Sequence, residues 1–266
     1  MNILLTNDDG IEAEGIQKLA EVLRSRSKHR VFLIAPDKNC SGVSHAISIL
    51  TKPVKLTAVS EDTWSCCGFP GDCVIIGMKG GLPERPDLAL SGINKGENLG
   101  TDIIYSGTVA AARQASLYGI PALALSLAGR GGNDFYWDMA ASWSVDHLEE
   151  LLAYWRKETF VNVNIPNSPG GPVGIVTAWP SVKDYRDKMT GTDAPDGSRF
   201  FSLEAGKELI LSESGCDSDI VSRNYVSVST IYNYPAVSRE FCPDLPTLAS
   251  VGGTVNADYQ FAKDRP

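Results

Sequence analysis

Apolar positions follow two spacings along the first 166 residues, and the pattern predicts alternating strands and helices. Asn2–Thr6 and Val31–Ala35 are short apolar runs that stop at polar residues, as buried strands do. Between them, apolar residues recur at helical spacing from Gly15 to Arg26. A strand, a helix and a strand in this order predict a β-α-β unit with parallel strands.

The pattern continues as far as Pro166. Three further strands and two further helices are predicted: Leu88–Leu90, Pro121–Leu127 and Phe160–Ile165 as strands, Thr108–Tyr118 and Met139–Arg156 as helices. Val43–Ser60 predicts a hairpin that turns at Lys52-Pro53, whereas Cys73–Met78 fits either a helix or a strand.

Beyond Pro166, proline, glycine and serine become frequent and the predicted strands are short. They are Val173–Thr177, Glu208–Leu211 and Val226–Ile231. The fold expected is therefore α/β. A Rossmann-like, doubly wound, mostly parallel sheet occupies residues 1–166, and a β-rich appendage for oligomerisation and substrate shaping occupies residues 167–256. Residues 257–266 are expected to form a flexible tail.

Composition narrows the classes of function. The 266 residues carry a formal net charge of −8, which argues against binding polymeric nucleic acid. No stretch has the length of a membrane span, and the apolar run at the N-terminus is too short for a signal peptide, so we expect a cytoplasmic protein without membrane contact. The six cysteines form no Cys-x-x-Cys pairs, which favours small buried residues over a zinc site or disulfides.

Polar clusters follow three of the predicted strands. They are Asn7–Gly10, Asp37–Gly42 and Ser91–Gly96. Because the carboxyl ends of parallel strands meet at one edge of a sheet, we expect the three clusters to converge there, where ligands of such sheets bind.

The first cluster contains the adjacent carboxylates Asp8 and Asp9. Two such charges ~4 Å apart repel by about 4 kcal/mol at an effective dielectric of 20, so a partly buried pair calls for a cation or a proton. Ser41 and Asn94 can add neutral oxygen ligands, and an all-oxygen set suits Mg²⁺, Mn²⁺ or Ca²⁺. The alternative is that the aspartates only form a turn and cap a helix.

The start of the Thr108 helix has features of an anion site. Ser106, Gly107 and Thr108 let backbone N–H groups approach an anion, and Asn98 lies in the glycine-rich loop before them. The alternatives are a simple helix cap and, for Asn98, a bond within its own turn. Neither a phosphate loop nor a dinucleotide fingerprint is present. His45 is near these loops and is either a ligand contact or an ordinary hairpin residue.

Six sequence motifs follow one another along the first half of the chain. They are Ile3-Leu4-Leu5-Thr6-Asn7-Asp8-Asp9-Gly10, Ala35-Pro36-Asp37-Lys38-Asn39-Cys40-Ser41-Gly42, Gly68-Phe69-Pro70-Gly71-Asp72-Cys73-Val74, Ser91-Gly92-Ile93-Asn94, Asn98-Leu99-Gly100 and Tyr105-Ser106-Gly107-Thr108-Val109-Ala110-Ala111-Ala112. In this order they resemble the SurE family of survival proteins, which are 5′/3′-nucleotidases.

The resemblance implies a metal-dependent phosphatase that hydrolyses nucleoside 5′- and 3′-monophosphates and also short polyphosphate. It implies one divalent cation per subunit, Mg²⁺ or Mn²⁺ with Ca²⁺ as a substitute in crystals, held by Asp8, Asp9, Ser41 and Asn94. It implies phosphate contacts from Asn98, Ser106, Gly107 and Thr108. It also implies a homodimer or homotetramer with exchanged C-terminal segments.

The chain departs from the family pattern at four positions. Cys40 stands where arginine is common, Phe69 replaces a small hydroxyl residue, Cys216 precedes Asp217 in place of threonine, and Asn224 replaces glycine. Lys95 is either a substitute for the missing arginine charge or a solvated lysine. Trp179 and Tyr185 are candidates for stacking on a base or for burial in a subunit interface.

The mechanism expected is metal-assisted hydrolysis, with Asp8 as general base and Asp9 mainly as a ligand. Three other classes of function remain open from the residues alone. They are a nucleotide sensor without catalysis, a Rossmann oxidoreductase, which the missing glycine fingerprint disfavours, and a structural oligomer whose acidic site stabilises the fold.

Overall fold

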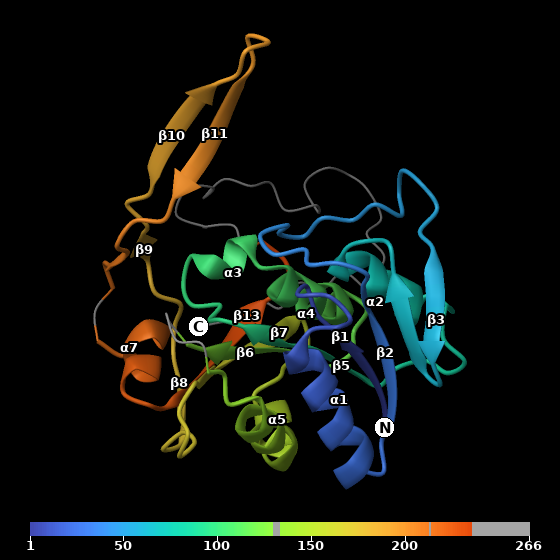
Figure 1. Ribbon diagram of the computed structural model, residues 1–266. Coiled ribbons are helices and arrows are strands. Elements are labelled where there is room, and N and C mark those ends of the chain that lie inside the picture. The colour runs from blue at the N-terminus through green and yellow to red at the C-terminus, as the bar shows by residue number, and fades with distance from the viewer. Residues whose placement is uncertain (130–133, 213, 236–266) are drawn as a thin grey trace, which may run out of the picture. The chain divides into compact units, whose positions relative to one another are not determined.

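The computed structural model of the protein describes residues 1–129, 134–212 and 214–235, in which the chain forms a central sheet of nine strands (Figure 1). The strand order is β3-β4-β2-β1-β5-β6-β7-β13-β8. The bounds are β1 (Asn2–Thr6), β2 (Arg30–Pro36), β3 (Leu56–Ser60), β4 (Thr63–Cys66), β5 (Leu88–Lys95), β6 (Ala122–Ala128), β7 (Thr159–Pro166), β8 (Ile175–Thr177) and β13 (Val226–Tyr232). From β4 to β7 the neighbours run parallel, whereas β3 and β13 run antiparallel to β4 and β7. The mostly parallel α/β sheet predicted from the sequence is confirmed.

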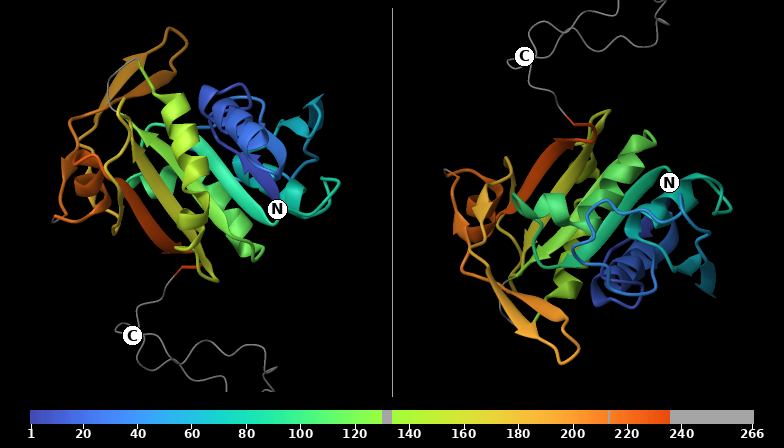
Figure 2. Two further views of the ribbon diagram at one scale, coloured as in Figure 1. Left: turned by 90° about the horizontal axis from the view of Figure 1, so that it is seen from below. Right: turned by 90° about the horizontal axis from the view of Figure 1, so that it is seen from above.

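Helices cover both faces of this sheet, as Figures 1 and 2 show. α1 (Glu14–Arg26) and α5 (Trp137–Asp146) pack on one face, and α2 (Pro70–Met78) and α4 (Gly107–Leu117) pack on the other. Alternate residues of β1 divide between the two cores. Ile3 and Leu5 join the core under α1 and α5, and Leu4 joins the core under α2 and α4. The central strand is thus buried on both sides, as in a doubly wound fold.

The long helix predicted over Met139–Arg156 is wrong. α5 ends at Asp146, and a second helix, α6, covers Leu148–Leu152. His147 separates them because its backbone, with φ −105° and ψ 12°, leaves the helical region.

The hairpin predicted over Val43–Ser60 is also wrong. Only Leu56–Ser60 forms a strand, and it pairs with β4. The residues before it do not extend the ladder, because the carboxylate of Asp72 at the start of α2 accepts the backbone N–H groups of Ser48 and Ile49 at 3.0 and 2.9 Å. The ambiguous segment Cys73–Met78 is helical, as part of α2.

Strand β5 is longer than predicted. The strand expected over Leu88–Leu90 continues to Lys95, and its register with β6 shifts between Ser91 and Asn94. Asn94 therefore lies at the end of a strand and not within a free loop, which ties its position to the sheet.

Beyond Pro166 the chain returns to the sheet and also builds smaller elements. β13 and β8 extend the sheet next to β7, close to the predicted strands Val226–Ile231 and Val173–Thr177. The remaining elements are β9 (Lys183–Asp184), β10 (Lys188–Asp193), β11 (Arg199–Glu204), β12 (Leu209–Ile210) and α7 (Asp217–Ser222). β9 pairs with β12, within the segment predicted as the strand Glu208–Leu211. We call residues 181–212, which hold β9 to β12, the arm.

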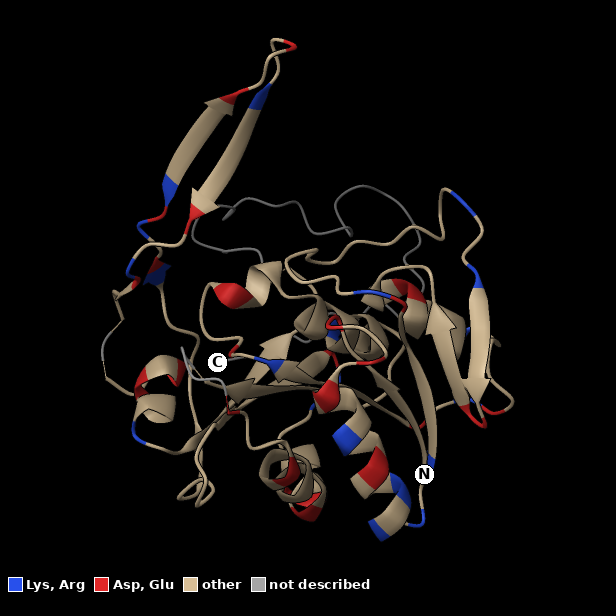
Figure 3. Cartoon of the chain, in the orientation of Figure 1, with Lys and Arg blue, Asp and Glu red and all other residues tan. Residues whose placement is uncertain are grey.

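The hairpin β10–β11 is exposed along its whole length. Figure 3 shows its charged residues at the two ends, with none between them. Lys188 pairs in register with Glu204, and Asp193 with Arg199, so opposite charges face each other across the strands.

Met1–Asn233 forms one compact unit. Much of the predicted appendage (residues 236–256) and the whole predicted tail (residues 257–266) lie outside the described residues, and the domain boundaries stay a prediction. None of the helices in the described ranges has both the length and the apolar character that crossing a bilayer requires. Among the cysteines in those ranges, Cys40, Cys66, Cys73 and Cys216 are buried and Cys67 is exposed, which confirms that most are buried residues.

Candidate active site

The candidate site lies where the strand order reverses. The chain leaves β1 for β2 on one side and later returns to form β5 on the other, so the carboxyl ends of β1 and β5 flank a crevice. Asp8 and Asp9 follow β1, and Asn94 and Lys95 end β5. The backbone N–H of Lys95 donates to Oδ2 of Asp9 at 2.9 Å. The structure thus joins two of the three predicted clusters directly.

The third cluster, after β2, joins the same place. The N–H of Cys40 donates to the carbonyl oxygen of Asp8 at 2.7 Å. Gly10 lets the two loops come this close, because it has φ +104° and a Cβ there would lie 3.1 Å from the carbonyl carbon of Lys38. Ser41 is held in this loop by Asn39, whose side-chain oxygen accepts its N–H at 2.7 Å.

Asn7, and not the aspartates, forms the turn after β1. Its amide group donates to the carbonyl of Gly10 at 2.8 Å and accepts the N–H of Gly10 at 3.2 Å. Helix α1 begins after Ala13, with no side chain capping it. The side chains of Asp8 and Asp9 therefore neither close this turn nor cap α1, and their carboxylates have partners elsewhere in the site.

Helix α4 points its N-terminus at Asp8. The hydroxyl of Thr108 donates to Oδ1 of Asp8. Gly107 permits the approach, since a Cβ there would lie 2.8 Å from the Cβ of Asp8. Ser106 is the N-cap residue and accepts the N–H of Val109 at 3.1 Å, so its capping role is confirmed.

Burial sets the charge state of the two aspartates in the absence of a ligand. Asp8 is only 3% exposed, and burial raises its pKa to about 6. Hydrogen bonds from Thr108 oppose this rise, and the charge of Asp9 adds to it. The pKa of Asp9 is also raised by burial, against the effect of Lys95. A bound cation would offset the cost of ionising both groups.

A cavity of about 580 Å³ opens beside these residues. Five of the predicted site residues line it: Asp8, Ser41, Asn94, Asn98 and Ser106. The other three lie directly behind its wall, Asp9 against Lys95 and both Gly107 and Thr108 against Asp8. The structure thus brings all eight predicted positions together, while their roles stay predictions.

Two asparagines of the site have defined hydrogen bonds. Asn94 donates its amide hydrogen to the carbonyl of Gly96 at 2.9 Å, so its side-chain oxygen is the atom that the predicted ligand role requires. Asn98 is buried, and its amide group donates to Oγ of Ser126 at 2.8 Å, not to its own turn. Its backbone N–H donates to the side chain of Asn164 at 2.8 Å. Strands β6 and β7 therefore hold Asn98 in place.

Of the remaining candidate residues, some line the cavity and others do not. Lys95 lines the cavity, with its ammonium 5.2 Å from the ring centre of Phe135, so it lies at the site. His45 bonds to Gln114 at 2.9 Å and does not line the cavity. Tyr185 lines the cavity, whereas Trp179 does not and is 55% exposed.

Sequence reasoning missed part of the cavity wall. Asp102 lies on the short helix α3 (Asp102–Tyr105), and Asp187 and Leu203 come from the arm. Asp102 lies between the motifs that contain Asn98 and Ser106, and no motif includes it. Within residues 181–212 only Tyr185 was a candidate for contact with the substrate, and the irregular sequence did not indicate that Asp187 and Leu203 reach the site. We call the residues that the strand ends and α4 supply the sheet side of the cavity, and Tyr185, Asp187 and Leu203 the arm side.

Within the described residues, no three His, Cys, Asp or Glu side chains form a metal-binding group. The predicted ligand set has only two carboxylates, completed by the neutral oxygens of Ser41 and Asn94, so it is of a different kind. Hard divalent cations such as Mg²⁺ and Mn²⁺ accept such oxygen donors. Buried Asp8 and half-buried Asp9 fit this requirement, because two adjacent carboxylates otherwise repel each other or bind a proton.

Comparisons with known proteins agree with this geometry. The family described as survival protein SurE matches residues 3–186. The 5′-nucleotidase SurE of Geobacter sulfurreducens is 39% identical over 247 residues, which cover 90% of this chain and 92% of that protein. The 5′-nucleotidase SurE of Synechococcus elongatus is 38% identical, with 87% and 93% covered. The crystal structure of the SurE protein from Aquifex aeolicus superimposes with a TM-score of 0.78 at 34% identity, and covers 92% of this chain and 98% of that one.

Proposed function

The chain belongs to the SurE family of survival proteins, and on this premise we propose that the cavity is the active site of a metal-dependent nucleotidase. The protein is a 5′-nucleotidase that hydrolyses nucleoside monophosphates to nucleoside and phosphate. This identity argues against the oxidoreductase and the purely structural oligomer, and the test below separates a nucleotidase from a nucleotide sensor. The observation that supports the site best is the buried carboxylate of Asp8 between a second carboxylate and the tip of α4.

We assign one divalent cation, Mg²⁺ or Mn²⁺, to Asp8, Asp9, Ser41 and Asn94. When bound, it neutralises charge on the phosphoryl group and makes the phosphorus more electrophilic. The four residues present only oxygen donors, as such cations prefer.

The chain's own groups would bind and orient the phosphate. At the start of α4, the N–H of Val109 is used by Ser106, so the N–H of Gly107 and the hydroxyl of Ser106 are candidate donors for a phosphate oxygen. Asn98 supplies a further contact from the opposite loop. A contact from Thr108 requires its hydroxyl to leave Asp8. These donors would stabilise the charge that spreads over the phosphoryl oxygens during hydrolysis.

Asp8 is the proposed general base. Its carboxylate lies at the cavity wall, and Thr108 fixes its orientation from behind. One of its oxygens can accept the proton of the attacking water while the other remains bonded to Thr108. Asp9 is held by the N–H of Lys95 and serves as a ligand.

The test is phosphate release from AMP by protein treated with EDTA and then supplied with Mn²⁺ or Mg²⁺. We expect activity to vanish on chelation and to return with either metal. Binding of AMP without phosphate release under every divalent metal would instead indicate a nucleotide sensor. Full activity in rigorously metal-free protein would remove the catalytic cation.

Several finer assignments belong to this proposal and rest on the family alone. They are hydrolysis of 3′-monophosphates and of short polyphosphate, a cytoplasmic location, and a homodimer or homotetramer with exchanged C-terminal segments. A panel of substrates crossed with metals, and light scattering of the purified protein, test the first and the last of these.

A further inference from the structure

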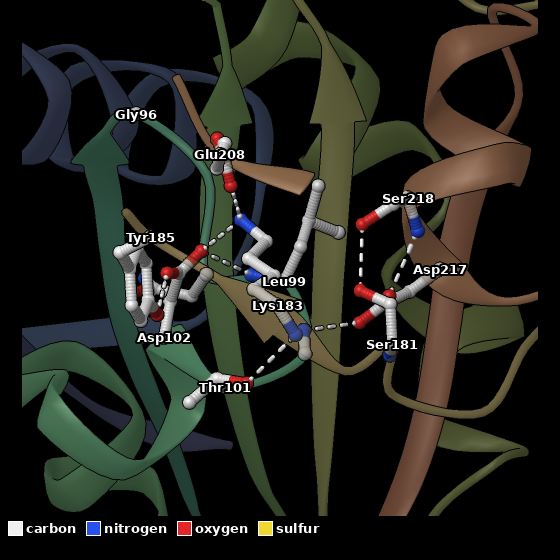
Figure 4. A network of polar contacts seen from close by, with 12 residues as sticks. Gly96, Leu99, Thr101, Asp102, Ser181, Lys183, Tyr185, Glu208, Asp217 and Ser218 are labelled. Carbon is white, nitrogen blue, oxygen red and sulfur yellow. Dashed lines mark hydrogen bonds and ion pairs between the residues drawn. The ribbon is translucent and has the colours of Figure 1, made fainter. Parts of the chain in front are cut away.

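Asp102 joins the arm to the loop that carries the phosphate-binding residues. Its carboxylate accepts one hydrogen bond from Nζ of Lys183 at 2.5 Å and another from the hydroxyl of Tyr185 at 2.6 Å (Figure 4). Ser106, the N-cap residue of α4, donates its N–H to the carbonyl of Asp102 at 3.0 Å. One residue therefore contacts both the arm and the start of the phosphate site.

The ion pair at this junction is buried. The side chain of Lys183 is 2% exposed, and its ammonium also pairs with Glu208 at 3.2 Å. Its backbone N–H donates to Oγ1 of Thr101 at 3.1 Å. Because a buried ammonium is stable only with such partners, the position of β9 against α3 is tightly specified.

A second set of bonds fixes the same junction. Asp217 is wholly buried and accepts the N–H of Gly100 at 2.7 Å and the N–H of Ser181 at 2.8 Å. The two backbones are so close that a Cβ on Gly100 would lie 2.1 Å from the carbonyl oxygen of Ser181. The first residues of the arm and the loop before α3 thus form one unit.

This junction places the ring of Tyr185 in the cavity wall, near Tyr105 and Leu203. Burial and the bond to Asp102 raise the pKa of Tyr185 well above its usual range, so the phenol stays a donor to Asp102. Its hydroxyl is therefore engaged, and the ring is the part that the cavity can use.

The charges of the cavity decide which end of a nucleotide lies there. Asp187 lines the cavity with Tyr185 and would repel a phosphate, and Asp102, whose charge is paired with Lys183, offers a phosphate no donor. The donors for phosphate gather instead at α4, next to the paired aspartates. The uncharged part of the substrate is left for the arm side, where aromatic and apolar surface is exposed.

We propose that Tyr185 is a specificity-determining residue that stacks on the base of the nucleoside monophosphate, with Asp102 and Lys183 as the positioning residues that hold its ring. The proposal deepens the function proposed above and rests on it. It predicts that the arm contributes to recognition of the base and not to cleavage of the phosphate ester.

The experiment compares AMP with ribose 5-phosphate, which has the same phosphate ester and sugar but no base. We expect Tyr185→Ala to lower kcat/KM for AMP by about tenfold, mainly through KM, because stacking on a base is worth a factor of this order. For ribose 5-phosphate, kcat/KM should change less than about twofold. Trp179→Ala is the matched control, since Trp179 is an aromatic residue just before the arm that lies outside the cavity, and it should change neither value.

Two further variants separate stacking from positioning. Tyr185→Phe keeps the ring and removes the bond to Asp102, so most of the AMP activity should return. Asp102→Asn should raise KM for AMP in the native protein but have little further effect in Tyr185→Ala. Thermal unfolding of each variant shows that it is folded.

The possible failures are distinct. Equal losses on AMP and ribose 5-phosphate, or no loss on either, would overturn the role of Tyr185. A wild-type protein that releases no phosphate from AMP would instead overturn the proposed function.

Discussion

The sheet side and the arm side of the cavity are built in different ways. On the sheet side, Asp8 and Asn94 lie at the ends of neighbouring parallel strands, and the regular sheet brings them together. On the arm side, Tyr185 depends on single long-range bonds to a helix of four residues. The comparison shows that the regular sheet positions the proposed reactive groups, whereas a few hydrogen bonds and ion pairs position the residue proposed to contact the base.

The largest effect is expected on the sheet side, from Asp8→Asn. Loss of the general base should lower kcat for AMP by about 10³, and because Asp8 is also a proposed ligand, excess Mn²⁺ should not restore the rate. Steady-state phosphate release is the measurement.

The matched control for this variant is Asp37→Asn. Asp37 lies on the neighbouring loop after β2 but is exposed and does not line the cavity. Near-normal turnover in Asp8→Asn, or an equal loss in Asp37→Asn, would contradict the role given to Asp8.

On the arm side, Lys183→Met should destabilise the protein by about 3 kcal/mol, because it leaves Asp102 and Glu208 together without their buried cation. Urea unfolding measures this loss. Lys18→Met removes ion pairs to Glu21 and Asp138 on the surface and should unfold near the wild type. An equal decrease in the free energy of unfolding in both variants would show that burial does not make the ion pairs of Lys183 more stabilising than those of Lys18.

Gly107→Ala tests how closely α4 must approach the sheet side. The added Cβ would lie 2.8 Å from that of Asp8, so we expect a loss of about 2 kcal/mol in stability, together with a lower kcat. The control is Gly170→Ala, where a Cβ meets nothing within 4 Å. Unchanged melting and turnover in Gly107→Ala would show that the helix can shift without consequence.

The smallest effect concerns pH. Burial raises the pKa of Asp8 to about 6, above its ordinary value of 3.8, so in metal-free protein this group's stabilising contribution is lost as the pH rises through 6. A cation competes with the proton. Its affinity should therefore fall up to about tenfold per pH unit below pH 6 and level off above it.

The shift in melting temperature that Mn²⁺ causes measures this effect. It is recorded from pH 5 to 7.5, a range that extends to both sides of the pKa of Asp8. The dependence should weaken in Asp8→Asn, where only Asp9 still competes for a proton, and persist unchanged in Asp37→Asn. A shift independent of pH in the native protein would show that Asp8 does not bind the metal.

The two sides also differ in how far the sequence alone predicts them. β1 was predicted with its observed bounds, and α1 and α4 each within one residue at both ends, because their apolar periodicity is regular. Once these elements are known, the convergence of Asp8 and Asn94 follows from parallel pairing. The sheet side could therefore be assembled before the structure.

On the arm side, Tyr185 was a candidate for base stacking, but its position in the cavity wall could not be predicted, for a physical reason. Lys183 and Tyr185 meet Asp102 across 81 and 83 positions, and the elements that carry them, β9 with two residues and α3 with four, are too short to show periodicity. The failed hairpin before Leu56 has a similar cause. There the carboxylate of Asp72 accepts hydrogen bonds from the backbone N–H groups of Ser48 and Ile49, which lie more than twenty positions earlier in the sequence.

The alternation of Ile3, Leu4 and Leu5 between two cores has a consequence for assembly of the protein. If β1 paired with β2 and β5 one residue out of register, Leu4 would exchange faces with its neighbours Ile3 and Leu5. Neither hydrophobic core would then pack correctly. The same slip would carry the two aspartates one position along the sheet edge. The register of β1 that packs both hydrophobic cores is therefore also the register that places the two aspartates correctly. Correct folding and activity thus depend on the same strand.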